Sequence, residues 1–214
     1  YGSFTVGTNG AWTYAIDNAN PAVQALKEGE TKTEVFTVKS VDGTSTTVTI
    51  SVVGTNDAPT AKADTAATDE DKPVTFTVLG NDTDPDGDTL TVTSASVDPA
   101  KGTVTVTPDG TLTFTPAANV NGPVTVTYTV SDGHGGTSTA TALVNIAPVA
   151  DPAVLGTGAG TVKEDTPAQS TASGTLTITD PDAGEAAFQP QTNVAGAYGS
   201  FTVGTNGAWT YAID

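Results

Sequence analysis

The sequence predicts an all-β protein built from antiparallel β-sandwiches. Thr alternates with β-branched or aromatic residues, as in 103–107 and 124–130, and this period of two is typical of half-buried strands. Gly, Asn, Asp and Pro interrupt these runs about every eight to twelve residues, which is the spacing of strands in a sandwich. The only helical turn that we expect lies within 21–29.

The alternating runs predict strands along the whole chain. They are 3–6, 11–16, 34–40, 45–53, 61–66, 73–79, 89–97, 102–107, 111–115, 123–131, 137–147, 161–164, 173–179, 199–203 and 208–213. The seven strands between 61 and 147 are enough for one complete sandwich. The stretches on either side hold only part of another.

An internal repeat explains these partial strand sets. The first seventeen residues, YGSFTVGTNGAWTYAID, recur unchanged as 198–214. Joining 151–214 to 18–57 produces one continuous segment with a full strand set. We therefore divide the chain into three parts. Residues 1–57 are the C-terminal part of one sandwich, 58–150 are a complete sandwich, and 151–214 are the N-terminal part of the next sandwich.

The repeated stretch is expected to be a hairpin with an apolar face. Its turn is 204–207, where Asn-Gly is the turn signal. The alternating apolar residues, including both Trp residues, are interpreted as core: Phe201, Val203, Trp209, Tyr211 and Ile213, and likewise Trp12 and Tyr14 in the first copy.

The charge balance excludes two classes of partner. The chain has 24 acidic against 7 basic residues, a net charge of −17, so we expect neither nucleic acid nor an anionic membrane as a partner. No stretch is apolar enough for membrane insertion. Such an acidic compact chain repels itself unless cations neutralise it.

The acidic residues gather at expected strand ends, and this points to a metal. The run 82–88 holds four Asp in seven residues. Carboxylate and carbonyl oxygens in loops suit Ca²⁺, whereas Zn²⁺ is disfavoured because the chain has no Cys and only His134. The run begins like an EF-hand loop, but Thr93 stands where the final Glu belongs, and strands flank it. Simple turns and solubilising acids remain the alternative interpretation.

Strand direction predicts two acidic poles in the complete sandwich. Consecutive strands run in opposite directions, so alternate loops meet at the same end. One pole is expected to gather Asp84, Asp86 and Asp132 next to Asn56 and Asp57. The other is expected to gather Glu70 next to Asp151, Asp180 and Asp182 of the following domain.

These motifs carry a family resemblance. LGNDTDPDGDTL and YTVSDGHGGT, within 58–150, resemble bacterial cadherin-like tandem repeats, which have an immunoglobulin/cadherin-like fold. VKEDTP, GTLTITDPDAGE, FTVKSVDGTST and GTNDAP, in 151–214 and 18–57, resemble a VCBS repeat. The resemblance implies extender modules of large RTX-type adhesins. Type I secretion exports such proteins to the Gram-negative bacterial cell surface, where Ca²⁺ at the joints stiffens them for adhesion or biofilm formation.

The resemblance also implies a set of metal ligands. Asn56 and Asp57 match the linker ligands, and Glu70 matches the acid near the first strand. Asp84 and Asp86 match the D-x-D ligands at the top of the next domain, with Asp132 beside them. In the split domain, the matching residues are Glu164, Asp180, Asp182 and Asp42. The second joint, IAPVADP, departs from the pattern because it lacks the Asn-Asp pair and keeps only Asp151.

The resulting prediction is a non-catalytic, Ca²⁺-stiffened extender. The alternative is a module that binds carbohydrate or ice on its Thr-rich strand faces. An enzyme is disfavoured because His134 lies in a Gly-rich turn and no nucleophile motif is present, so no catalytic residues are assigned. The expected partners are neighbouring repeats, together with head-to-tail self-association in which 151–214 of one chain meets 18–57 of the next.

Overall fold

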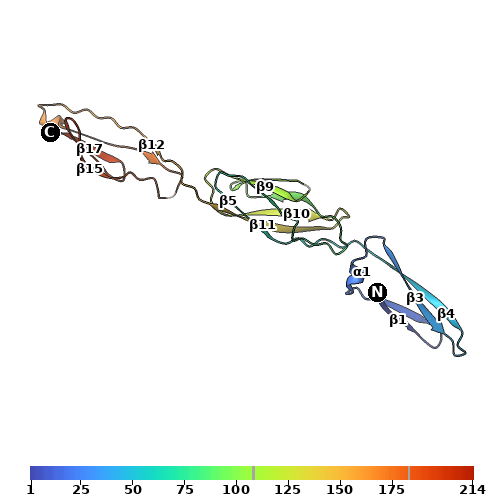
Figure 1. Cartoon of the computed structure of the whole chain (residues 1–214). Coiled ribbons are helices and arrows are strands. Elements are labelled where there is room, and N and C mark those ends of the chain that lie inside the picture. The colour runs from blue at the N-terminus through green and yellow to red at the C-terminus, as the bar shows by residue number, and fades with distance from the viewer. Residues whose placement is uncertain (108, 183) are drawn as a thin grey trace. The chain divides into compact units, whose positions relative to one another are not determined.

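The regular secondary structure of the chain is almost entirely β-strand, which confirms the predicted fold class (Figure 1). The structure is a computed structural model that describes residues 1–107, 109–182 and 184–214. It comprises two compact units, 1–147 and 148–214. Among the described residues, no helix is long and apolar enough to span a bilayer.

The first part of unit 1 consists of two hairpins and one helical turn. Their elements are β1 (Gly2–Val6), β2 (Trp12–Ile16), α1 (Pro21–Gln24), β3 (Thr31–Lys39) and β4 (Ser45–Val53). The turn α1 lies where the sequence predicts it, and the Asn20 side chain accepts a hydrogen bond from the Ala22 backbone N–H at 2.9 Å. Strands β1 and β2 pair with each other, as do β3 and β4, both antiparallel.

These two hairpins bury only part of their apolar faces. The ring of Phe4 stacks on that of Phe36 at 4.6 Å, which brings the two hairpins together. Nevertheless, Trp12 is 48% exposed and Val6 is 43% exposed. The interpretation of Trp12 as a core residue is therefore wrong for this copy, because the described residues supply no second layer over that part of the hairpin.

The rest of unit 1 is a complete two-sheet sandwich. Its strands are β5 (Asp64–Asp69), β6 (Val74–Thr77), β7 (Thr91–Ser96), β8 (Gly102–Val106), β9 (Thr111–Pro116), β10 (Gly122–Ser131) and β11 (Thr137–Ala147). One sheet has the order β5-β11-β10-β7 and the other β6-β9-β8. Strand β5 runs parallel to β11, and every other pairing in these two sheets is antiparallel.

The core of this sandwich lies between the two sheets. Inward residues of both sheets, such as Leu112 and Phe114 on β9 and Val126 on β10, are fully buried. The Tyr128 hydroxyl lies 2.6 Å from the Lys62 carbonyl oxygen and 2.7 Å from an Asp64 carboxylate oxygen. Burial and the hydrogen bond to Asp64 raise the pKa of Tyr128, so this hydroxyl stays protonated and links β10 to the start of β5.

Unit 2 contains a four-stranded sheet and a short two-stranded ladder. Its elements are β12 (Val154–Leu155), η1 (Pro167–Gln169), β13 (Thr171–Thr175), β14 (Ile178–Thr179), β15 (Gln191–Ala195), β16 (Gly199–Val203) and β17 (Ala208–Ile213). The sheet has the order β13-β17-β16-β15, and β12 pairs with β14. Strand β15 was not predicted from the sequence.

The strand expected at 161–164 is wrong. Residues 156–163 form no strand and instead lie against Trp209: a Cβ on Gly160 would stand 2.8 Å from the Trp209 ring. A strand needs a ladder partner, and in the complete sandwich the first strand, β5, pairs with the last, β11. The described part of unit 2 contains no counterpart of β11.

Candidate metal centre

The Asp-Pro-Asp-Gly-Asp loop turns three carboxylates toward one point. Asp84 Oδ1 accepts hydrogen bonds from the backbone N–H groups of Asp86, at 2.9 Å, and Asp88, at 3.2 Å. Gly87 has a φ of +70°, a left-handed conformation that favours glycine and closes this turn. As a result, Asp84, Asp86 and Asp88 each offer a carboxylate oxygen within 4.8 Å of the others.

The linker before the sandwich is docked onto this loop and onto a second loop. The Asp57 backbone N–H donates to Asp86 Oδ2 at 2.8 Å, and Asn56 Nδ2 donates to Asp132 Oδ2 at 2.8 Å. The structure thus brings together five residues that the sequence placed at one pole: Asn56, Asp57, Asp84, Asp86 and Asp132.

Three oxygens in this group are buried without a hydrogen-bond partner among the described residues. They are Asn56 Oδ1, Asp84 Oδ2 and Asp86 Oδ1. In each of these side chains the other polar atom makes one of the bonds described above. A buried oxygen without a partner is costly, and a hard cation is the ligand that satisfies several oxygens at once. The donor set, all oxygen and mostly carboxylate, fits Ca²⁺.

Asp132 is held in the tight turn between β10 and β11. Its Oδ1 accepts from the backbone N–H groups of His134, at 2.7 Å, and Gly136, at 3.0 Å. A Cβ on residue 136 would stand 2.1 Å from Asp132 Oδ2, so only glycine fits there. The hydrogen bond from Asn56, followed by these backbone bonds, holds the pKa of Asp132 below its usual range.

The lowered pKa of Asp132 predicts a pH-dependent contribution to stability. It is present above the unfolded-state pKa of about 3.9 and is lost as the pH falls through the lower folded-state value. In Asp132→Asn, an amide N–H₂ would face the N–H₂ of Asn56. We therefore expect this variant to unfold more easily at pH 7, with a deficit that shrinks below about pH 4. Denaturant unfolding with chelator from pH 7 to pH 2.5 measures this, and a deficit that stays constant with pH would contradict it.

Three further residues that sequence reasoning did not assign join this centre: Asp88, Lys27 and His134. Lys27 Nζ lies 2.5 Å from Asp88 Oδ1, and His134 Nε2 lies 3.8 Å from Asp88 Oδ2. The hydrogen bond to Asp88, together with the negative charges of Asp86 and Asp84, raises the pKa of Lys27. The signal for Asp88 was its place in the Asp-x-Asp-Gly-Asp run. Lys27 had none, because it is distant in sequence and precedes the linker.

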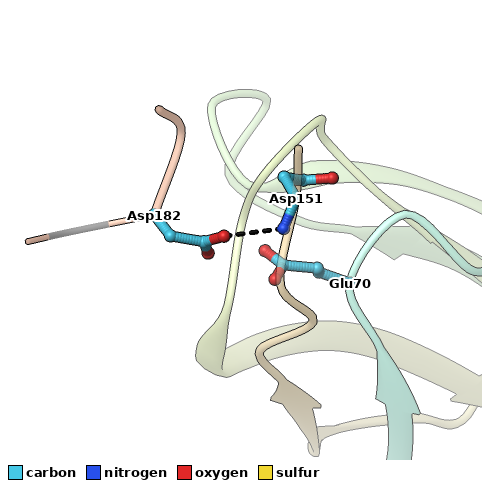
Figure 2. A group of neighbouring side chains, drawn as sticks. All are labelled: Glu70, Asp151 and Asp182. Carbon is cyan, nitrogen blue, oxygen red and sulfur yellow. Dashed lines mark hydrogen bonds between the residues drawn. The ribbon is translucent and has the colours of Figure 1, made fainter. Parts of the chain in front are cut away.

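Unit 2 repeats part of this arrangement. The Asp151 backbone N–H donates to Asp182 Oδ2 at 2.7 Å, as Figure 2 shows. The Asp182 N–H donates in turn to Asp180 Oδ1 at 2.9 Å, as Asp86 does to Asp84. Carboxylate oxygens of Asp180, Asp182 and Glu185 lie within 4.8 Å of one another. An Asp-x-Asp loop docked onto the preceding linker is therefore common to both units.

The remaining predicted ligands lie in different surroundings. Glu70, at the end of β5 in unit 1, is buried, and Asn121 Nδ2 lies 3.4 Å from its Oε2. Its expected meeting with Asp151, Asp180 and Asp182 stays a prediction. Glu164 is exposed in unit 2. Asp42 is exposed in the β3–β4 turn, where it accepts hydrogen bonds from the Ser40 hydroxyl and the Thr44 N–H.

Comparisons with known proteins define the class of fold. Residues 56–146, less than half of the chain, match the family described as bacterial Ig domain. No curated protein matches the chain. Similar solved structures include human CDH23 EC21-23, with 16% identity, a TM-score of 0.54, and coverage of 86% of this chain and 64% of that structure. They also include protocadherin gamma B7 extracellular cadherin domains 1–4, with 14% identity, a TM-score of 0.51, and coverage of 100% and 56%.

The chain thus has an Ig-like and cadherin-like β-sandwich fold. It spans less than two thirds of each of these two structures, and 44% of the protocadherin gamma B2 domains 1–5 that it also matches. At such low identity the likeness shows the fold. Folds of this class are generally non-catalytic.

Proposed function

We propose that the chain is a non-catalytic extender whose joint between residues 1–57 and 58–147 is stiffened by Ca²⁺. The observation that carries this proposal is the set of three buried oxygens without partners, on Asn56, Asp84 and Asp86. They come from both sides of the joint, since Asn56 belongs to the linker and both Asp residues belong to the sandwich. A cation bound to them would cross-link the linker to the sandwich.

The ion would act through charge as well as through coordination. Asp84, Asp86 and Asp88 repel one another at these distances, and Lys27 offsets only part of that charge. Without a divalent ion, repulsion favours states in which the linker and the loop separate. With the ion, separation costs the coordination bonds of both sides, so the joint is held in one geometry.

The setting proposed for this extender is a bacterial surface adhesin of the RTX type. The match of residues 56–146 to a bacterial Ig domain supports a bacterial extracellular repeat. The VCBS-like motifs of 151–214 and 18–57 support an array in which such domains alternate. In that setting the extender would project binding domains from the cell for adhesion or biofilm formation.

Small-angle scattering of the whole chain tests the stiffening. We expect a larger maximum dimension and a less flexible profile in millimolar Ca²⁺ than in excess chelator. Asp86→Asn should keep the chelator profile in both solutions. Asp98→Asn should respond like the unaltered chain, because Asp98 is exposed and lies outside the group formed by Asp84, Asp86 and Asp88. Identical profiles with and without Ca²⁺ would overturn the proposal.

A further inference from the structure

The repeated hairpin is covered differently in its two copies. Residues 1–17 and 198–214 have the same sequence, yet Trp12 is 48% exposed and Trp209 is 7% exposed. The neighbouring pair behaves in the same way, with Val6 at 43% and Val203 at 5%. Because the sequences are identical, the difference comes entirely from what packs on the hairpin.

In the first copy, β3 covers the part of the apolar face near Phe4 and Tyr14. The Phe36 ring stacks on Phe4 at 4.6 Å and lies 6.1 Å from Tyr14. The Tyr14 hydroxyl donates to Glu34 Oε2 at 2.5 Å, and this bond raises the pKa of Tyr14 to about 12. These contacts define the surface of the hairpin onto which β3 docks.

In the second copy, that surface borders an open apolar hollow. The hollow, of about 320 Å³, is lined by Phe201 and Tyr211, the copies of Phe4 and Tyr14, together with Trp209, Val162, Ala172 and Leu176. Glycines of the segment before β13 close over Trp209 instead. The two copies therefore cover complementary parts of one face, and the hollow lies beside the residues that Phe36 contacts in the other copy.

The complete sandwich of unit 1 shows what a fully covered hairpin of this kind looks like. Strands β8 and β9, GTVTV and TLTFTP, correspond to β16 and β17, GSFTV and AWTYAI. All three hairpins close with the same hydrogen bond across the turn and a left-handed glycine, with φ of +80°, +83° and +79° at Gly10, Gly110 and Gly207. At the positions of Trp209 and Tyr211, Leu112 and Phe114 are fully buried beneath β10 and β11.

We propose that residues 151–214 of one chain and 18–57 of a second copy close into a single β-sandwich around the 198–214 hairpin. The second copy's β3 and β4 take the place that β10 and β11 occupy in the complete sandwich. The hairpin 1–17 of the second copy is displaced. Phe36 then enters the hollow, and Glu34 meets Tyr211 as it met Tyr14.

The exchange is favourable because it keeps one set of contacts and adds another. The contacts to Phe36 and Glu34 are remade by identical residues. The segment before β13 gains β4 as a neighbour, just as β5 has β11 as its neighbour in the complete sandwich. Exposed apolar residues such as Val154 at 69% and Leu155 at 57% become available for burial. The two surfaces differ, so the contact is head-to-tail and propagates into chains of molecules rather than closed dimers.

Cross-linking tests the register directly, because the chain has no native cysteine. Glu34→Cys protein is mixed with Tyr211→Cys protein, warmed to allow exchange, cooled, and treated with a short bis-maleimide. We expect heterodimers joined between positions 34 and 211, identified by peptide mass. The Tyr14→Cys, Glu34→Cys double variant provides a control that cross-links within one chain. In a Glu34→Cys, Tyr211→Cys double variant, a 34–211 link found only in monomers would overturn the proposal in favour of closure within one molecule.

A matched pair of substitutions tests the exchange in solution. Phe4→Ala weakens the packing of the hairpin 1–17 against β3, and this hairpin must be displaced for association. The substitution should therefore tighten self-association in sedimentation velocity, lowering the apparent Kd by about tenfold or more. Phe201→Ala removes the same ring from the incoming copy and should weaken association by a similar factor. Unfolding of unit 2 cannot produce the tighter association expected of Phe4→Ala. In the double variant the two hairpins are again identical and the two effects offset each other, so its apparent Kd should return to that of the unaltered chain. Shifts in the same direction for both variants, or a monomeric Phe4→Ala chain at every concentration, would refute the exchange.

Discussion

Millimolar Ca²⁺ is expected to raise the thermal unfolding midpoint of unit 1 by roughly 5–10 °C relative to excess chelator. An ion that binds only the folded state adds about 2.7 kcal/mol when its concentration is 100 times its Kd. In a chain of 214 residues each kcal/mol corresponds to roughly 2–4 °C. The ion also relieves the repulsion among Asp84, Asp86 and Asp88. Scanning calorimetry with and without Ca²⁺ measures the shift.

One substitution and its control separate specific binding from screening. Asp86→Asn removes the negative charge of a carboxylate at the centre of the site. The Oδ1 of that carboxylate is buried without a partner, and its Oδ2 accepts a hydrogen bond from the linker. We therefore expect this substitution to abolish most of the Ca²⁺-induced rise in the unfolding midpoint. Asp98→Asn removes the same charge from an exposed turn of the same sandwich and should leave the shift intact. Mg²⁺ should be less effective because it demands a small octahedral site. Equal loss in both variants would mean that the acids act only through bulk charge.

The acidic pole could be predicted because it depends on the local geometry of turns and on the direction of the strands. Asp84, Asp86 and Asp132 sit in turns whose residues dictate their own geometry, and alternate strand ends meet at one pole. The contact between Lys27 and Asp88 could not be predicted in this way. It joins residues separated by the whole linker, and it depends on how the linker docks rather than on any motif.

The same motif can have a different environment when its neighbours differ. Asp42 and Asp132 both occupy an Asp-Gly turn and accept backbone hydrogen bonds two residues on, yet Asp132 is buried and Asp42 is exposed. The difference is the linker residue Asn56, which covers Asp132. Sequence patterns indicate the turn. Burial requires the partner that packs on it, which explains why Trp12 was misjudged and Trp209 was not.

Comparing substitutions at the two Trp residues therefore measures how much the packing of the rest of unit 2 stabilises its hairpin. Trp209→Ala is expected to destabilise unit 2 by about 3–5 kcal/mol, the usual cost of removing a buried aromatic side chain. Trp12→Ala should cost about 1 kcal/mol or less, because half of that side chain already meets water. The sequence, the pairing between the two strands of the hairpin and the neighbouring Phe at 6.0 Å are the same in both copies. The difference thus isolates the packing of residues 151–197.

Fluorescence gives the same comparison without a cavity. With excitation selective for tryptophan, the emission of Trp12→Phe comes from Trp209 and that of Trp209→Phe comes from Trp12, because the chain has two Trp residues. We expect a bluer emission maximum and weaker quenching by iodide for Trp209 than for Trp12, measured at concentrations where the chain is monomeric. Head-to-tail association would leave Trp209 buried while it displaces the hairpin that holds Trp12. Raising the concentration should therefore redden the Trp12 spectrum and leave the Trp209 spectrum in place. Equal emission maxima and equal costs for the two alanine variants would mean that both hairpins are covered alike in solution.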